Sequence, residues 1–91
     1  MTRGCEAVCT ATLTLMRPAD LALIAATRAD LKSGAARTAR SAAGIRQAEI
    51  ARALGVSRQA VSHWETGRSV PSAEHALAYG KLLRQLGRAA A

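Results

Sequence analysis

Aromatic residues are almost missing from this chain, which has one Trp, one Tyr and no Phe among its 91 residues. A hydrophobic core must therefore be built from Ala, Leu, Ile and Val around Trp64 and Tyr79. Alanine is the strongest helix former and is depleted in strands, so this composition favours packed helices over sheets. A chain of this length buries one small core. We therefore expect an all-α fold, a compact bundle of four to five short helices.

Cysteine is also scarce. Cys5 and Cys9 are the only two, and both lie in the first ten residues. Two thiols four residues apart cannot make a disulfide framework, which favours a reducing compartment. A zinc site would need two further ligands, and the only histidines, His63 and His75, are distant in the sequence. We expect no metal and no cofactor.

Long apolar runs are absent, so no segment is expected to span a membrane. The N-terminal stretch MTRGCEAVCTATLTLM has an early Arg3, but threonines interrupt its apolar run and no small-residue cleavage site follows. We therefore expect a cytoplasmic protein. No nucleophile, base and orienting group share a suggestive spacing, and no glycine-rich phosphate loop occurs, so we expect no enzyme.

Acidic residues are few: six Asp and Glu stand against thirteen Lys and Arg, which leaves a net charge of +7 and a pI near 11.1. Such a charge serves either solubility or binding to nucleic acid. Most of the cations are arginine, whose planar fork suits phosphate and guanine. The type of cation therefore favours nucleic acid.

The chain divides into four stretches by composition. Residues 1–17 are threonine-rich without helix signals and are expected to form a disordered arm. Residues 18–33 read as an extra N-terminal helix, and residues 34–86 as a helix-turn-helix domain. Residues 87–91 read as a tail, because Gly87 is expected to end a last helix that Ser72 caps.

The extra helix begins with Pro18, a residue that suits a first helical turn. One stripe at helical spacing carries five side chains: Leu21, Ile24, Ala25, Arg28 and Leu31. We interpret this stripe as a packing face, on which the three large aliphatic side chains cover the core or form a dimer seam. Gly34 either ends this helix or only weakens it.

Two short apolar-periodic runs, QAEIARAL and RQAVSHWET, are joined by Gly55, Val56 and Ser57. In the first run Ile50, Ala51 and Leu54 share one face. In the second run the apolar side is formed by Ala60, Val61 and Trp64. The opposite side is continuous and polar, and consists of Arg58, Gln59, Ser62, His63 and Thr66.

This polar side differs from an ordinary solvated face, which usually carries Lys and Glu. Arginine reads guanine and glutamine reads adenine by paired hydrogen bonds, while serine and threonine contact bases or phosphates. Ser57 is placed as the N-cap, where the positive end of the helix dipole favours a phosphate. We interpret the segment as a recognition helix.

These residues together resemble the helix-turn-helix of the phage Cro/repressor family of transcription regulators, over roughly residues 35–84. Ala51 stands where the family needs a small residue for its helices to cross, and Gly55 where its turn needs a left-handed backbone. Val61 stands where the family buries a branched side chain, beside the apolar Trp64.

The resemblance implies roles for individual residues. Gln47 and Arg68 would contact backbone phosphates on either side of the recognition helix, and Glu65 would form a salt bridge with Arg40. Four side chains would face base edges in the major groove: Arg58, Gln59, Ser62 and His63. Arg46 departs from the family, which prefers Ser, Thr or Asn at the N-cap of the helix that begins at Gln47. For Arg46 and Arg52, a functional role such as a phosphate contact and an ordinary solvated side chain are equally open.

The leading hypothesis is a sequence-specific DNA-binding regulator, a repressor that acts as a homodimer on an inverted repeat and is associated with the nucleoid. Many family members dimerise through a fifth helix, a role that the helix at residues 18–33 is suggested to take here. The alternative is an antitoxin that represses its own promoter and binds a toxin partner through its N-terminal arm.

Overall fold

The computed structural model describes residues 17–90, with side chains through Gly87. It contains five helices and, within this range, no strand, which confirms the all-α prediction. They are α2 (Pro18–Ser33), α3 (Ala35–Ala42), α4 (Gln47–Leu54), α5 (Arg58–Glu65) and α6 (Ala73–Ala90). The predicted arm, with Cys5 and Cys9, lies outside the described residues except for Arg17. No helix in the described part is both long and apolar enough to cross a membrane.

Local chemistry sets the ends of the short helices. Gly34 has φ +92° and ends α2, which settles the question that the sequence left open at this residue. Gly55 has φ +73° and lets the chain turn from α4 into α5. The Ser57 hydroxyl accepts a hydrogen bond from the Ala60 N–H at 3.1 Å, as expected of an N-cap. At the start of α4 the Glu49 carboxylate accepts from the Arg46 N–H at 2.9 Å.

The core lies where α2, α3, α4, α5 and α6 meet. Its buried members are Leu31, Ala36, Ile50, Ala51, Val61, Trp64 and Tyr79. The ring centroids of Trp64 and Tyr79 are 6.5 Å apart, within the range of favourable aromatic pairs. The two aromatic residues of the chain therefore lie together at the centre, surrounded by aliphatic side chains.

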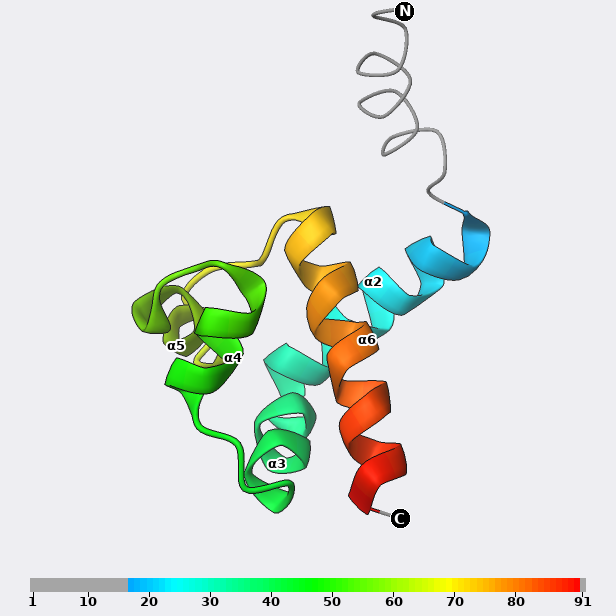
Figure 1. Ribbon diagram of the computed structural model, residues 1–91. Helices are drawn as coiled ribbons and strands as arrows, with labels where there is room; N and C mark the ends of the chain where they lie inside the picture. Colours follow the sequence, from blue (N-terminus) through cyan, green and yellow to red (C-terminus); the bar gives the residue numbers. More distant parts are fainter. Residues whose placement is uncertain (1–16, 91) are drawn as a thin grey trace, which may run out of the picture.

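The helices α2 and α6 cross and pack closely, on the side of the molecule away from α4 (Figure 1). Gly80 lies at this crossing: a Cβ atom there would overlap Thr27 Oγ1 and lie 3.0 Å from Leu23 Cγ. The Thr27 hydroxyl donates to the Leu23 carbonyl at 2.8 Å, so this buried polar group is satisfied within its own helix. Only glycine lets the α6 backbone approach α2 this closely.

The packing face of α2 differs from the predicted stripe. Ile24 and Leu31 are buried as expected, but Leu21 is 57% exposed and Ala25 is exposed. Thr27 is buried instead. The reason is the crossing with α6, which covers the side of α2 that carries Ile24, Thr27 and Leu31. Leu21, in the first turn of α2, is not covered.

Two predicted helix ends also need correction. The last helix does not end at Gly87 but continues to Ala90, because Gly87 lacks the positive φ that would turn the chain out of the helix. The recognition segment ends at Glu65, one residue earlier than expected, and Thr66 is its C-cap. The Thr66 hydroxyl donates to the Ser62 carbonyl at 2.9 Å.

Candidate nucleic-acid interface

One open hollow runs along α5 and the turn that follows it. Six residues line it: Arg58, Gln59, Ser62, His63, Thr66 and Arg68. All six are among the residues that the sequence analysis assigned to DNA contact. The structure thus brings them together on one surface, with Ser62 and His63 half-buried and the others exposed.

The hollow stays open because the opposite side of α5 is committed to the core. Val61 is 0% exposed and Trp64 is 6% exposed, so α5 cannot rotate without exposing both. Ala51 of α4 is buried next to α5, and the small side chain lets the two helices lie close together. The Val56 N–H donates to the Ala51 carbonyl at 2.9 Å and closes the turn at Gly55. The orientation of the polar face therefore follows from apolar packing.

A buried polar network centred on Glu65 joins α3, α4, α5 and α6. Arg40 donates from Nε to Oε2 at 2.8 Å and from Nη2 to Oε1 at 3.0 Å, which is the salt bridge that the resemblance implied. The Tyr79 hydroxyl donates to Oε2 at 2.7 Å, and Gln47 Nε2 donates to Oε1 at 2.9 Å. Sequence reasoning placed Tyr79 in the core but did not connect it to Glu65, because no local spacing links the two residues.

These contacts determine the charge states in the network. Burial alone would raise the pKa of Glu65, but the hydrogen bonds from Arg40, Gln47 and Tyr79 outweigh it and hold that pKa below its usual 4.5. The hydrogen bond to Glu65 raises the pKa of Arg40. Burial, followed by the hydrogen bond to Glu65, raises the pKa of Tyr79. At neutral pH Glu65 is therefore an anion, Arg40 a cation, and Tyr79 a neutral donor.

Gln47 connects this buried network to the exposed face of α5. Its Oε1 accepts a hydrogen bond from Arg58 Nη1 at 3.3 Å, while its Nε2 donates to Glu65. An amide nitrogen carries two hydrogens, so one remains for an acceptor outside the protein. The phosphate contact expected of Gln47 is compatible with this geometry and stays a prediction.

A second hollow lies beside the first, between the end of α3 and the start of α4. Its arginines are Arg37, Arg40, Arg46 and Arg58, and Gln47 also lines it. Arg46 is exposed and extended at the N-cap of α4, which is compatible with either reading of this residue. Arg37 was not among the predicted site residues; its position one helical turn before Arg40 is the signal that could have found it. Arg52 lines neither hollow.

Charge is unevenly distributed over these two hollows. No Asp or Glu is among the described residues that line them, and the buried Glu65 is paired with Arg40, so the lining arginines make the surface positive. Across residues 17–90 no three His, Cys, Asp or Glu side chains gather in a way that could hold a metal ion. The arrangement offers hydrogen-bond donors and positive charge to an extended anionic partner.

Comparison with known families agrees with this geometry. A helix-turn-helix family model matches residues 37–86, which covers more than half of the chain and includes α4, α5, most of α3 and most of α6, but not α2. Neither the curated proteins nor the solved structures gave a significant match. Because this match covers more than half of the chain and includes the α4–α5 motif with its buried ion pair, the chain belongs to the Cro/repressor-type helix-turn-helix family of DNA-binding regulators.

Proposed function

We propose that the protein is a sequence-specific repressor that inserts α5 into the major groove of double-stranded DNA. The observation that carries this proposal is the open, polar face of α5 opposite the buried Val61 and Trp64. An α-helix fits the major groove, where each base pair presents its own pattern of donors and acceptors. Four side chains are assigned to base edges: Arg58, Gln59, Ser62 and His63.

The residues around this face are assigned to the DNA backbone. Arg46 is the N-cap of α4, which Gln47 begins, Ser57 is the N-cap of α5, and Thr66 and Arg68 follow α5. Four of them line the two hollows: Arg46 and Gln47 the second, and Thr66 and Arg68 the first. Ser57 precedes Arg58, which lines both. Phosphate contacts fix the position of a protein on the duplex, and the base edges then provide the specificity.

We further propose a homodimer that binds two half-sites about one helical turn apart. Leu21 on α2 supports this part, since it is a large apolar side chain that is 57% exposed. Sedimentation of the chain at high micromolar concentration tests it, and a strictly monomeric protein contradicts it. The antitoxin alternative shares the DNA-binding step, and co-purification with a toxin partner would distinguish it from a stand-alone repressor.

Selection of bound sites from random duplexes, followed by sequencing, tests specificity and dimer geometry together. We expect an enriched, symmetric motif whose half-sites are centred about 10 base pairs apart. Binding should weaken steeply with added salt, because arginines release counterions from the phosphates. A purified chain that shows no preference among duplexes, even in dilute buffer, would overturn the proposal.

A pair of substitutions separates the two kinds of contact. Gln59→Ala should relax the preference at one base position by about 1–3 kcal/mol, because an amide that reads a base edge is lost. Arg68→Ala should weaken all sequences alike and lower the salt dependence by about one counterion. Arg84→Ala removes the same charge from an exposed position of α6 and serves as the control. Indistinguishable profiles for Gln59→Ala and Arg68→Ala would show that these roles are wrongly assigned.

A further inference from the structure

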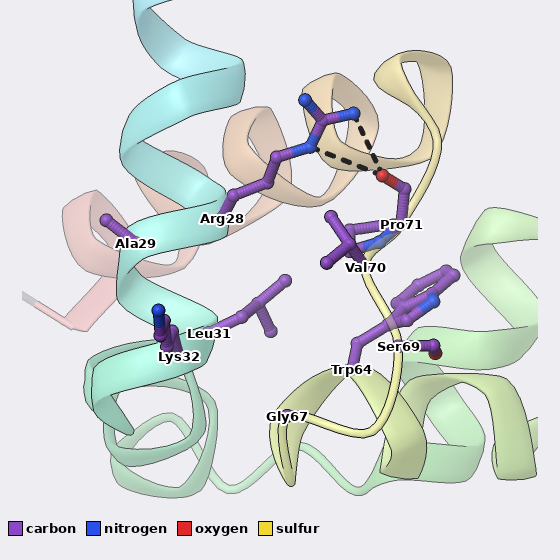
Figure 2. A pocket seen from close by; sticks show the side chains of 9 residues that line it. All are labelled: Arg28, Ala29, Leu31, Lys32, Trp64, Gly67, Ser69, Val70 and Pro71. Carbon is purple, nitrogen blue, oxygen red and sulfur yellow. Dashed lines mark hydrogen bonds between the residues drawn. The ribbon is translucent and has the colours of Figure 1, made fainter.

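A third concave region lies away from the recognition face, between α2 and the loop that joins α5 to α6 (Figure 2). The cleft has a volume of about 440 Å³. This volume falls within the range of about 300–1,000 Å³ found for small-molecule sites. Neither the family match, which leaves out α2, nor the DNA-binding surface accounts for it.

The walls of the cleft are mainly apolar. Figure 2 shows Leu31 of α2 pointing toward the loop and Val70 of the loop pointing toward α2, with Trp64 beside them. Val70 is 69% exposed, so an apolar occupant would remove much of its surface from water. Pro71 completes the wall at one end.

The rim of the cleft is positively charged. Arg28 and Lys32 lie one helical turn apart on α2, and none of the described residues that line the cleft carries a carboxylate. Arg28 donates from Nε and Nη2 to the Pro71 carbonyl at 3.3 and 3.0 Å. Its other terminal nitrogen points away from Pro71 in Figure 2. Lys32 also lines the cleft, and its side chain lies farther from the loop than Leu31 does in this view. The two cations make the cleft suitable for an anionic ligand.

We propose that this cleft binds a small carboxylic acid with an apolar body. The carboxylate lies between Arg28 and Lys32, and the apolar body lies against Leu31, Val70 and Trp64. The cations Arg28 and Lys32 select a ligand with a negative charge, and the volume of the cleft limits the size of that ligand.

Occupancy of the cleft also affects DNA binding, a consequence that rests on the proposed function. The cleft wall is the loop that follows α5, and this loop carries Arg68, which is assigned to a phosphate. A carboxylate that binds the other terminal nitrogen of Arg28 and then draws the guanidinium toward itself weakens the two Arg28 hydrogen bonds to the Pro71 carbonyl, which loosens the link between α2 and the loop. Because the ligand favours the loosened loop, it lowers the affinity for DNA.

Trp64 provides a direct readout, since it is the only tryptophan of the chain and lines the cleft. The DNA-free full-length protein is titrated with octanoate, and with 1-octanol as the neutral analogue, at constant ionic strength. We expect a saturable change in Trp64 fluorescence with octanoate and at least tenfold weaker binding of octanol. No saturation with octanoate at millimolar concentration, or equal affinities for the two compounds, would overturn the proposal.

Matched variants locate the binding. Lys32→Met should weaken octanoate binding at least threefold, whereas Lys81→Met, which removes the same charge from an exposed position of α6, should not. Val70→Phe fills the cleft from an exposed position and should abolish binding while the circular dichroism stays unchanged. Equal effects of Lys32→Met and Lys81→Met would place the acid elsewhere. If Val70→Phe changes the oligomeric state and leaves octanoate binding intact, the cleft is an interface between two copies and the proposal is wrong.

The effect on DNA is measured separately. Saturating octanoate should raise the Kd for the selected DNA site at least fivefold in the natural chain and leave it unchanged in Val70→Phe. Octanoate binding without a change in Kd would refute the coupling but retain the site. A chain that binds no DNA would refute the proposed function, while the fluorescence titration would still decide whether the cleft binds acids.

Discussion

Two helix pairs in this small protein are held together in different ways. The α4–α5 pair rests on a buried charged network in which Glu65 receives hydrogen bonds from Arg40, Gln47 and Tyr79. The α2–α6 pair rests on a close backbone approach, where Gly80 faces Thr27. The first pair therefore depends on the charge of the Glu65 carboxylate, and the second on the absence of a side chain at Gly80. The pair that carries the candidate DNA-binding surface thus combines apolar packing, through Val61 and Trp64, with a buried network of directional polar bonds.

Breaking the ion pair should have the largest effect. Arg40→Met leaves the Glu65 carboxylate, which is 1% exposed, buried without its cation. We expect a loss of about 3–5 kcal/mol in the free energy of unfolding, measured by urea denaturation. The double variant Arg40→Met with Glu65→Leu should recover part of this loss, because no buried charge remains. A loss below about 1 kcal/mol would mean that the pair behaves like a surface salt bridge.

Adding volume at the α2–α6 crossing should have the next largest effect. Gly80→Ala places a methyl group against Thr27 and Leu23, which should cost about 1–3 kcal/mol in unfolding free energy. Gly87→Ala in the same helix is the matched control, since nothing lies within 4 Å of the added atom. It should stabilise the protein by up to about 1 kcal/mol, because alanine is the better helix former. Equal effects of the two variants would show that the crossing is not tightly packed.

Lowering the pH should have the smallest effect on the unfolding free energy, and it should affect only the α4–α5 pair, which contains the Glu65 carboxylate. Because the pKa of Glu65 is lower in the folded chain than its usual 4.5, its contribution to stability is present above pH 4.5 and is lost as the pH falls through the folded value. Glu65→Gln should therefore lose less stability than the natural chain between pH 5 and the acid limit. Gly80→Ala should show the natural pH profile, displaced by a constant amount. Parallel profiles for Glu65→Gln and the natural chain would contradict the role of Glu65.

Part of the site could be predicted because its signals are local. The polar face from Arg58 to Thr66 follows from helical spacing, and Ser57 and Gly55 act through their own side chain or backbone. The Arg40–Glu65 bond was predicted only through the family resemblance, since the two residues are 25 positions apart. Tyr79, which bonds the same carboxylate from α6, had no such guide.

The sequence by itself determined where helices form, which side of α5 is polar and which residue types face outward, because these properties depend on neighbours within one or two turns. Only the tertiary structure decided that Thr27 is buried while Leu21 is exposed, that α6 continues past Gly87, and that Arg28 reaches the Pro71 carbonyl to border a cleft. The physical reason is that burial and hydrogen bonding between distant residues depend on how helices cross. In this protein that crossing is set by the close approach of two backbones at one glycine, Gly80.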